Sequence, residues 1–329
     1  MVPIRFRSRS FILASLLLTA TALPASAQTA PIRQVPGVYH QAIGEVRVTA
    51  LFDGVVPLAR AELSGIDDAG KQALLASRHV PETPQGLQTA VNAYLVQRGD
   101  VLTLVDAGTA RCFGPGLGHV LENLRSAGYS PEQVDQVLIT HAHPDHLCGL
   151  LDGQGHEAFP KATVWLARAD AVYWLDPKTE TRADTRAAFR PLFKMARDAV
   201  APYQAGGRLR LFARGERLPE GVSGLDSPGH TPGHTSFLFD AGAGQQLLVW
   251  GDIVHYHAVQ FSRPDASFEA DLDRGLAIAS RRALMAWVAD GGWWLAGAHL
   301  PFPGLGHVRR DDDAFAWVPA EFSPLPGEQ

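Results

Sequence analysis

The stretch Val137-Leu-Ile-Thr-His141-Ala-His143-Pro-Asp145-His146 decides the fold, because an apolar strand runs directly into four polar side chains. Its first two histidines are two residues apart, which places both imidazoles on one side of an extended backbone. The proline then turns the chain, so that Asp145 and His146 present a carboxylate and an imidazole from the next turn. Four such ligands would crowd a single tetrahedral ion, and the spacing therefore favours two neighbouring metal ions.

Three later strand ends repeat this order of an apolar run, a small residue and a potential ligand. They are Ser227-Pro-Gly-His230-Thr-Pro-Gly-His234, Leu247-Leu-Val-Trp-Gly-Asp252 and Trp293-Trp-Leu-Ala-Gly-Ala-His299. Proline and glycine prevent a regular helix around the two histidines of the first run, so tight turns must hold them. A lone Asp252 or His299 would more often be an ordinary turn or core residue. Together with the first cluster, however, they complete a set of ligands.

The rest of the chain alternates predicted strands and helices. Strands are expected at 44–52, 90–97, 101–105, 137–140, 162–166, 209–212, 236–239, 247–250 and 293–296, and helices at 67–78, 117–128, 168–174, 181–199 and 272–288. Asp53-Gly54 is typical of a turn. Runs of strands with interspersed helices, in two similar halves, predict an α+β four-layer αββα sandwich: two mixed sheets packed face to face, with helices outside.

The amino terminus predicts export. Spaced arginines precede the apolar segment 11–18, and Ala25-Ser26-Ala27 offers the small residues that a signal peptidase accepts. We therefore expect residues 1–27 to be a cleaved Sec-type signal peptide, with an uncleaved membrane anchor as the alternative. Residues 28–329 would then form a single secreted or periplasmic domain.

Composition excludes some classes of partner. The 329-residue chain has a formal net charge of −5 and no run rich in lysine and arginine, which argues against nucleic acid. No stretch after the signal peptide is long and apolar enough to cross a membrane. With only two cysteines, Cys112 and Cys148, the chain cannot depend on disulfides to stabilise a fold of this size. Export would permit a disulfide between them, but packing is the favoured role for Cys148.

The complete pattern resembles the metallo-β-lactamase superfamily, and within it methyl parathion hydrolase and its lactonase-like relatives. The narrower likeness rests on the flanking runs Phe113-Gly-Pro, Ala127-Gly-Tyr-Ser-Pro-Glu-Gln-Val-Asp and Pro301-Phe-Pro-Gly-Leu-Gly-His. The resemblance implies one ion bound by His141, His143 and His234, a second bound by Asp145, His146 and His299, and Asp252 bridging the two. His230 would then be a supporting residue, and Asp106 would orient a ligand.

The donor set indicates the chemistry. Imidazole and carboxylate groups suit Zn²⁺, with Mn²⁺, Co²⁺ and Fe²⁺ as alternatives. Two such ions lower the pKa of a bridging water to about 7, and the resulting hydroxide would be the nucleophile. Asp145 and Asp252 are therefore expected to serve catalysis. His255 could donate a hydrogen bond or proton to a leaving oxygen, unless it is an ordinary exposed loop residue.

The resemblance also suggests a substrate class. Phe113, Trp174 and Phe193 align with aromatic residues of the leaving-group pocket in this family, although such residues could equally be core. With His255 they favour opening of a lactone or cleavage of an aryl ester with an apolar or aromatic group. Organophosphate triester hydrolysis is the alternative, and a β-lactamase or a non-hydrolytic iron enzyme is a weaker one. The resemblance also implies a homodimer, with exposed aromatics such as Phe302 or Trp317 as candidate contacts.

Overall fold

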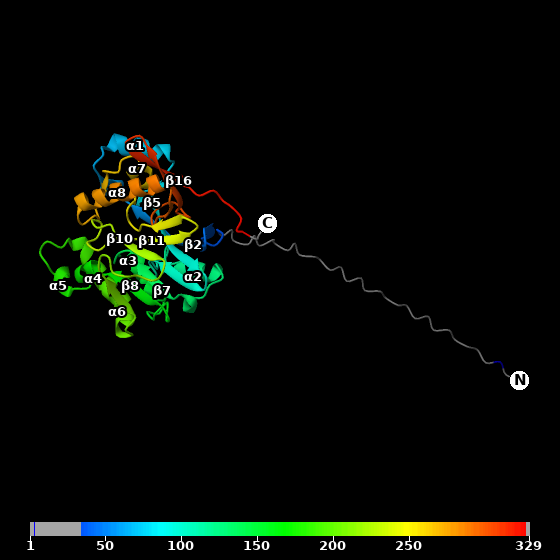
Figure 1. Cartoon of the computed structure of the whole chain (residues 1–329). Coiled ribbons are helices and arrows are strands. Elements are labelled where there is room, and N and C mark those ends of the chain that lie inside the picture. Colours follow the sequence, from blue (N-terminus) through cyan, green and yellow to red (C-terminus); the bar gives the residue numbers. More distant parts are fainter. Residues whose placement is uncertain (1–2, 4–33, 327–329) are drawn as a thin grey trace. The chain divides into compact units, whose positions relative to one another are not determined.

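The computed structural model describes residue 3 and residues 34–326 of the chain (Figure 1). Its helices and strands belong to the second of two units, Pro36–Gln329. The signal peptide expected at 1–27, with its cleavage site, falls outside the described residues apart from residue 3. None of the described helices is long and apolar enough to cross a membrane.

The first sheet combines an antiparallel half with a parallel half. Its strands run in the order β1-β2-β5-β6-β7-β8-β9, and β4 pairs with β5 at the side. The pairs β6·β7, β7·β8 and β8·β9 are parallel, and the others are antiparallel. The bounds are β1 (Val38–Ile43), β2 (Val46–Leu58), β4 (Glu82–Thr83), β5 (Gly86–Arg98), β6 (Val101–Val105), β7 (Gln136–Ile139), β8 (Thr163–Ala167) and β9 (Leu209–Phe212).

The second sheet has the order β10-β11-β12-β14-β15-β16, and only β12·β14 is parallel. A short antiparallel pair, β3·β13, lies apart from both sheets. The bounds are β3 (Leu63–Ser64), β10 (Val222–Asp226), β11 (Thr235–Gly242), β12 (Gln245–Val249), β13 (Ser267–Phe268), β14 (Trp294–Ala296), β15 (Leu305–Asp311) and β16 (Ala314–Pro319).

Eight α-helices connect these strands in the described residues. They are α1 (Asp68–Ser77), α2 (Val120–Ser126), α3 (Pro144–Leu147), α4 (Arg168–Trp174), α5 (Pro177–Glu180), α6 (Arg190–Ala205), α7 (His257–Gln260) and α8 (Arg274–Gly291). Figure 1 shows α8 on one side of the strands and α6 on the other.

The buried side chains place the sheets face to face between layers of helices. One apolar cluster joins Val48 and Leu138 of the first sheet to Phe237 and Leu247 of the second. A second cluster packs the other face of the first sheet against α2 and α6, and a third packs the second sheet against α8. This confirms the predicted αββα sandwich, with burial of apolar faces as its main stabilising term.

Two predicted elements differ from the structure. Asp53-Gly54 is not a turn, because β2 continues to Leu58 with only a shift of register between Phe52 and Gly54. The Asp53 carboxylate is instead buried and accepts hydrogen bonds from the loop after β6. The helix predicted at 181–199 begins only at Arg190 and runs to Ala205. Pro191 in its first turn is the local signal for that start.

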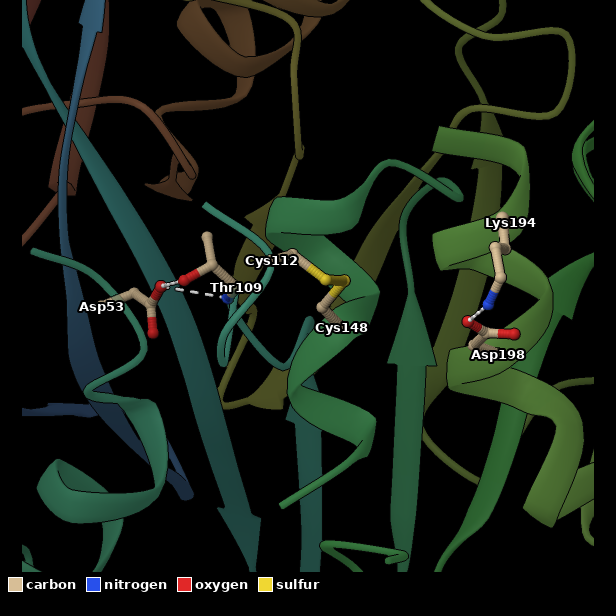
Figure 2. Close-up of a disulfide and its surroundings, with 6 residues drawn as sticks. All are labelled: Asp53, Thr109, Cys112, Cys148, Lys194 and Asp198. Atoms are coloured by element: carbon tan, nitrogen blue, oxygen red, sulfur yellow. Dashed lines mark hydrogen bonds and ion pairs between the residues drawn. A yellow bond between two sulfur atoms is a disulfide. The ribbon is translucent and has the colours of Figure 1, made fainter. Parts of the chain in front are cut away.

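The two cysteines are paired, which corrects the expectation of simple packing for Cys148. A disulfide joins Cys112 to Cys148, whose Cα atoms lie 6.4 Å apart (Figure 2). The sequence could not reveal the pairing, because 36 residues separate the two cysteines and only the fold brings the loop after β6 beside α3.

The aromatic residues expected at a dimer surface are engaged within the chain. The Phe302 ring lies 5.4 Å from Phe52, and the Trp317 ring lies 6.0 Å from Phe261. Both residues are half-buried. Neither is therefore a free aromatic patch, and the homodimer stays a prediction.

Candidate metal centre

The predicted ligands meet at one edge of the sandwich because the strands before them end there. In the first sheet β6 leads to Asp106 and the parallel β7 leads to His141. In the second sheet β12 leads to Asp252 and the parallel β14 leads to His299. Loops after the carboxyl ends of parallel strands are where functional residues collect, and here two sheets contribute them.

Two groups of side chains could each hold an ion, and within each group the ligand atoms lie within 4.8 Å of one another. The first comprises His141, His143, His230 and Asp252, and the second comprises Asp145, His146, Asp252 and His299. Asp252 belongs to both groups, as expected of a bridging carboxylate. The structure thus brings together every predicted ligand except His234, and it adds His230.

The structure gives His234 and His230 the opposite roles from those expected from the sequence: His230 joins a ligand group, and His234 supports it. The Nδ1 of His234 lies 2.8 Å from the Ser227 hydroxyl, and its Nε2 accepts the backbone N–H of Asp252 at 2.9 Å. Both ring nitrogens are therefore engaged, which corrects the expectation of a ligand. Gly251 permits this close approach, because a Cβ there would lie 2.7 Å from the Nε2 of His234. His234 thus positions the backbone at Asp252.

His230 points its Nε2 into the centre instead. That atom lies 3.3 Å from Oδ2 of Asp252 and 3.0 Å from Nδ1 of His143. The other nitrogen, Nδ1, contacts Oδ1 of Asp271 at 2.9 Å. The carboxylate fixes the ring with Nδ1 as the donor, so Nε2 could bind an ion after losing its proton. Residue spacing could not separate His230 from His234, since both follow a glycine in the same turn-rich run.

The Asp252 carboxylate is surrounded by imidazoles. Its Oδ1 lies 3.1 Å from Nε2 of His146. Its Oδ2 lies 3.2 Å from Nε2 of His299 and 3.5 Å from Nε2 of His141. A carboxylate placed between the two histidine groups in this way would belong to both metal sites.

Other ligands are oriented by partners behind them. Asp106 contacts Nδ1 of His146 at 2.8 Å and also accepts the N–H and hydroxyl of Thr140. The Nδ1 of His299 lies 2.8 Å from the carbonyl oxygen of Ala90. The expected orienting role of Asp106 therefore has a geometric basis. In each case Nδ1 is occupied, which leaves Nε2 toward the centre.

Asp271 is a functional residue that the sequence interpretation missed. Besides His230 it accepts the Ser267 hydroxyl and the Phe268 N–H at 3.1 Å each. Arg281 of α8, which is buried, lies 3.7 Å from the same carboxylate and donates to the carbonyl oxygen of Ile253. No local pattern marks Asp271, because its partner His230 lies 41 residues away.

Asp170 of α4 was also missed, and it joins the two histidine loops. Its Oδ2 accepts the N–H of Ala142 at 2.7 Å, and its Oδ1 accepts the N–H of Gly233 at 2.6 Å. Burial raises the pKa of Asp170 to about 6. This carboxyl therefore holds the His141–His143 segment and the 230–234 segment in one arrangement.

Charge balance explains which histidines hold protons. Burial lowers the pKa of His141 and His143 well below the ordinary value, which favours the neutral form that binds metal. Burial also opposes protonation of His230, but its hydrogen bonds to Asp252 and Asp271 outweigh burial and raise its pKa to about 9. The carboxylates thus favour the binding of positive charge at the centre.

The donor atoms fit divalent cations. The Nε2 atoms of His141 and His146, which face Asp252, are buried and have no hydrogen-bond partner among the described residues. Leaving two such atoms unpaired would be costly, whereas a bound cation would satisfy them. The set contains nitrogen and carboxylate oxygen and no thiolate, because the cysteines are in the disulfide.

A cavity of about 210 Å³ lies over this centre. Besides His143, Asp145, His230, Asp252, His255 and His299, it is lined by Val56, Leu58, Phe113, Pro144, Phe189, Leu192, Phe268 and Ala270. Phe113 therefore lies where it was predicted. Trp174 and Phe193 do not line the cavity, because both are fully buried with their rings 4.6 Å apart. The Trp174 ring packs behind His143 at 4.9 Å.

His255 is buried in the lining rather than exposed on a loop. Its Nε2 lies 3.0 Å from Oδ2 of Asp252, and burial lowers its pKa to about 4. A neutral ring that donates from Nε2 to a carboxylate keeps Nδ1 as an acceptor. The Nδ1 of His255 has no partner among the described residues. In this state His255 holds Asp252 and is not a proton donor at Nδ1.

Fold and site together define a metal-dependent hydrolase: an αββα sandwich with two histidine–aspartate groups that share one carboxylate. The family model of the metallo-beta-lactamase superfamily matches residues 86–308, and the chain belongs to that superfamily. No curated protein matches the sequence.

Solved structures give the same assignment. The hydrolase AbOPH of the beta-lactamase superfamily is 38% identical, with a TM-score of 0.85, over 89% of this chain and 100% of that one. AidC, a dizinc quorum-quenching lactonase in complex with a product, is 24% identical, with a TM-score of 0.77, over 88% and 99%. A probable metal-dependent hydrolase from Staphylococcus aureus is 20% identical, with a TM-score of 0.67, over 86% and 100%. The last two show the fold alone.

Proposed function

We propose that this protein hydrolyses lactones or aryl esters at a centre of two divalent ions. The observation that carries the proposal is the pair of ligand groups sharing Asp252 beneath a small, largely apolar cavity. His141, His143 and His230 would hold one ion, and Asp145, His146 and His299 the other. Zinc is the favoured metal, because imidazole and carboxylate donors suit it.

The ions, when bound, supply an activated water nucleophile and stabilise the negative charge that develops on the substrate oxygen. The protein supplies the geometry. Asp106 and Asp271 orient His146 and His230. His255 and His234 hold the side chain and the backbone of Asp252. Asp145 is the other carboxylate in these two ligand groups, and it borders the cavity directly.

The cavity supports a compact, neutral substrate. Away from the ligand groups and His255, its walls are aliphatic and aromatic side chains with no charge. Such walls favour an apolar or aromatic group beside the scissile bond. Its volume of about 210 Å³ suits a bicyclic aryl lactone better than a long acyl chain held entirely inside. The structural likeness to a dizinc lactonase is consistent with this choice.

A substrate comparison tests the proposal. The metal-loaded protein is assayed with dihydrocoumarin, an acyl-homoserine lactone and methyl parathion, and kcat/KM is compared. We expect the aryl lactone to be preferred, followed by the acyl-homoserine lactone. A clear preference for the phosphotriester would overturn the ranking. Phosphotriester hydrolysis is the second candidate, because the same apolar cavity would accept a neutral triester.

We also propose that the protein is exported after cleavage behind Ala27 and acts as a homodimer. The Cys112–Cys148 disulfide supports export, because such bonds persist in oxidising compartments. Mass spectrometry of the protein from a periplasmic fraction should give an amino terminus at Gln28.

Light scattering of the purified protein tests the proposed homodimer, and a monomeric mass would contradict it.

A further inference from the structure

Phe113 is the one residue of the cavity wall that lies on the loop between β6 and α2. Its side chain is 41% exposed, and no aromatic ring among the described residues contacts it. Gly114, which follows, has a positive φ of 94° and open space where a Cβ would lie. Packing therefore holds this ring only in part.

The ends of the loop are held by a buried carboxylate. Oδ2 of Asp53 accepts the Thr109 N–H at 3.0 Å and the Gly118 N–H at 3.1 Å. The Thr109 hydroxyl donates to the same oxygen at 2.6 Å (Figure 2). Oδ1 of Asp53 accepts the Val120 N–H at 3.1 Å. These bonds close the base of the loop and leave the segment between Thr109 and Gly118 to be held by other means.

The disulfide supplies that restraint next to Phe113. Cys112 is its neighbour in sequence, and Cys148, which is buried, caps the end of α3. The same helix carries Asp145 and His146, so the disulfide joins the loop covalently to the element that bears two candidate metal ligands. The cross-link therefore restrains the backbone next to Phe113 relative to α3.

We propose that the Cys112–Cys148 disulfide is a specificity-determining element that holds Phe113 in the wall of the substrate cavity. This inference rests on the proposed function of that cavity. Without the cross-link the ring must be ordered each time a substrate binds. The free-energy cost of ordering one side chain on binding should raise KM for an aryl lactone about threefold to tenfold in a protein without the cross-link. We expect kcat to change less than twofold.

Four variants of the full, metal-loaded protein test the proposal: the double variant Cys112→Ser/Cys148→Ser, Phe113→Ala, their triple combination, and Phe322→Ala as a control. Phe322 is 87% exposed, lies outside the cavity lining and provides a matched loss of a phenyl ring. We expect KM for dihydrocoumarin to rise in the double variant and in Phe113→Ala. The triple variant should add little to Phe113→Ala, because both changes remove the same wall. Phe322→Ala should behave as the parent.

Independent KM effects that multiply in the triple variant would overturn the proposal. So would an unchanged KM in Phe113→Ala, a result that does not depend on the double variant folding. Hydrogen exchange of the amides at 110–117 gives a readout without substrate, and we expect it to be faster in the double variant. If the parent hydrolyses no lactone or ester, the proposed function fails on its own. Unchanged exchange in the double variant would still refute the restraint.

Discussion

At the scale of single residues, the centre depends on which nitrogen of each histidine is already engaged. His230 uses Nδ1 for Asp271 and directs Nε2 to the shared carboxylate. His234 uses both nitrogens, for Ser227 and for the backbone of Asp252. Two histidines four residues apart thus have different tasks, one as a proposed ligand and the other as a support for the bridging residue.

Replacing these two histidines should separate the tasks. We expect His230→Ala to retain at most one equivalent of tightly bound metal, because a ligand to one ion is lost. His234→Ala should keep a ligand for each ion but bind metal about tenfold to a hundredfold more weakly, as when an orienting partner is removed. Elemental analysis after dialysis against metal-free buffer measures the difference. Two retained equivalents in His230→Ala would show that the residue is not a ligand.

Asp170 predicts a dependence of stability on pH. Its pKa is raised by burial from 3.8 to about 6, so the folded state binds this proton more tightly than the unfolded state does. The protonated carboxyl of Asp170 therefore stabilises the folded state at low pH. This contribution is lost as the pH rises between about 4 and 6, and it amounts to about 3 kcal/mol for a shift of about two pKa units. Asp170→Asn cannot titrate. The free energy of unfolding of the metal-free parent, minus that of Asp170→Asn, should fall across this window. A constant difference would contradict the prediction.

At the scale of elements, α8 supports the centre through its first turns. Asp273 caps the helix by accepting the Leu276 N–H at 3.0 Å, and its own N–H donates to the carbonyl oxygen of Gly229 at 2.8 Å. Gly229 lies directly against the helix, since a Cβ there would be 2.0 Å from the Ala277 nitrogen. The helix thus holds the segment that begins at His230.

Removal of the cap should destabilise the protein modestly. Asp273→Ala leaves the Leu276 N–H without its side-chain acceptor and should lower the free energy of unfolding by about 1 kcal/mol. Asp273→Asn should lose much less, because the amide oxygen can still accept. Asp313→Ala, a change at an exposed aspartate, is the control. Urea unfolding measures all three, and equal stability of Asp273→Ala and the parent would contradict the cap.

Local patterns predicted some elements well and others poorly for a physical reason. The strand before His141 and the ends at Asp252 and His299 were predictable, because apolar runs followed by small residues are local signals. Asp53 was misread as a turn residue, since its partners lie on the loop at 109–120, far along the chain. Trp174 looks the same in sequence whether it lines a cavity or packs behind His143.

At the scale of the whole molecule, the centre spans the two sheets. His141 and His146 follow a strand of the first sheet, whereas Asp252 and His299 follow strands of the second. Bound ions would therefore couple the two halves of the sandwich, and binding to the folded state alone would stabilise it. The αββα class followed from the order of elements in the sequence, but the meeting of loops from both sheets required the packed structure.

The central claim is that two ions held by these side chains make the protein a hydrolase, and a metal titration of its activity tests that claim most directly. Protein stripped by a chelator is titrated with Zn²⁺ while hydrolysis of dihydrocoumarin is followed. We expect no activity in the stripped protein and a rise that levels off at two equivalents per chain. Full activity without metal would contradict the account, as would a plateau reached at one equivalent.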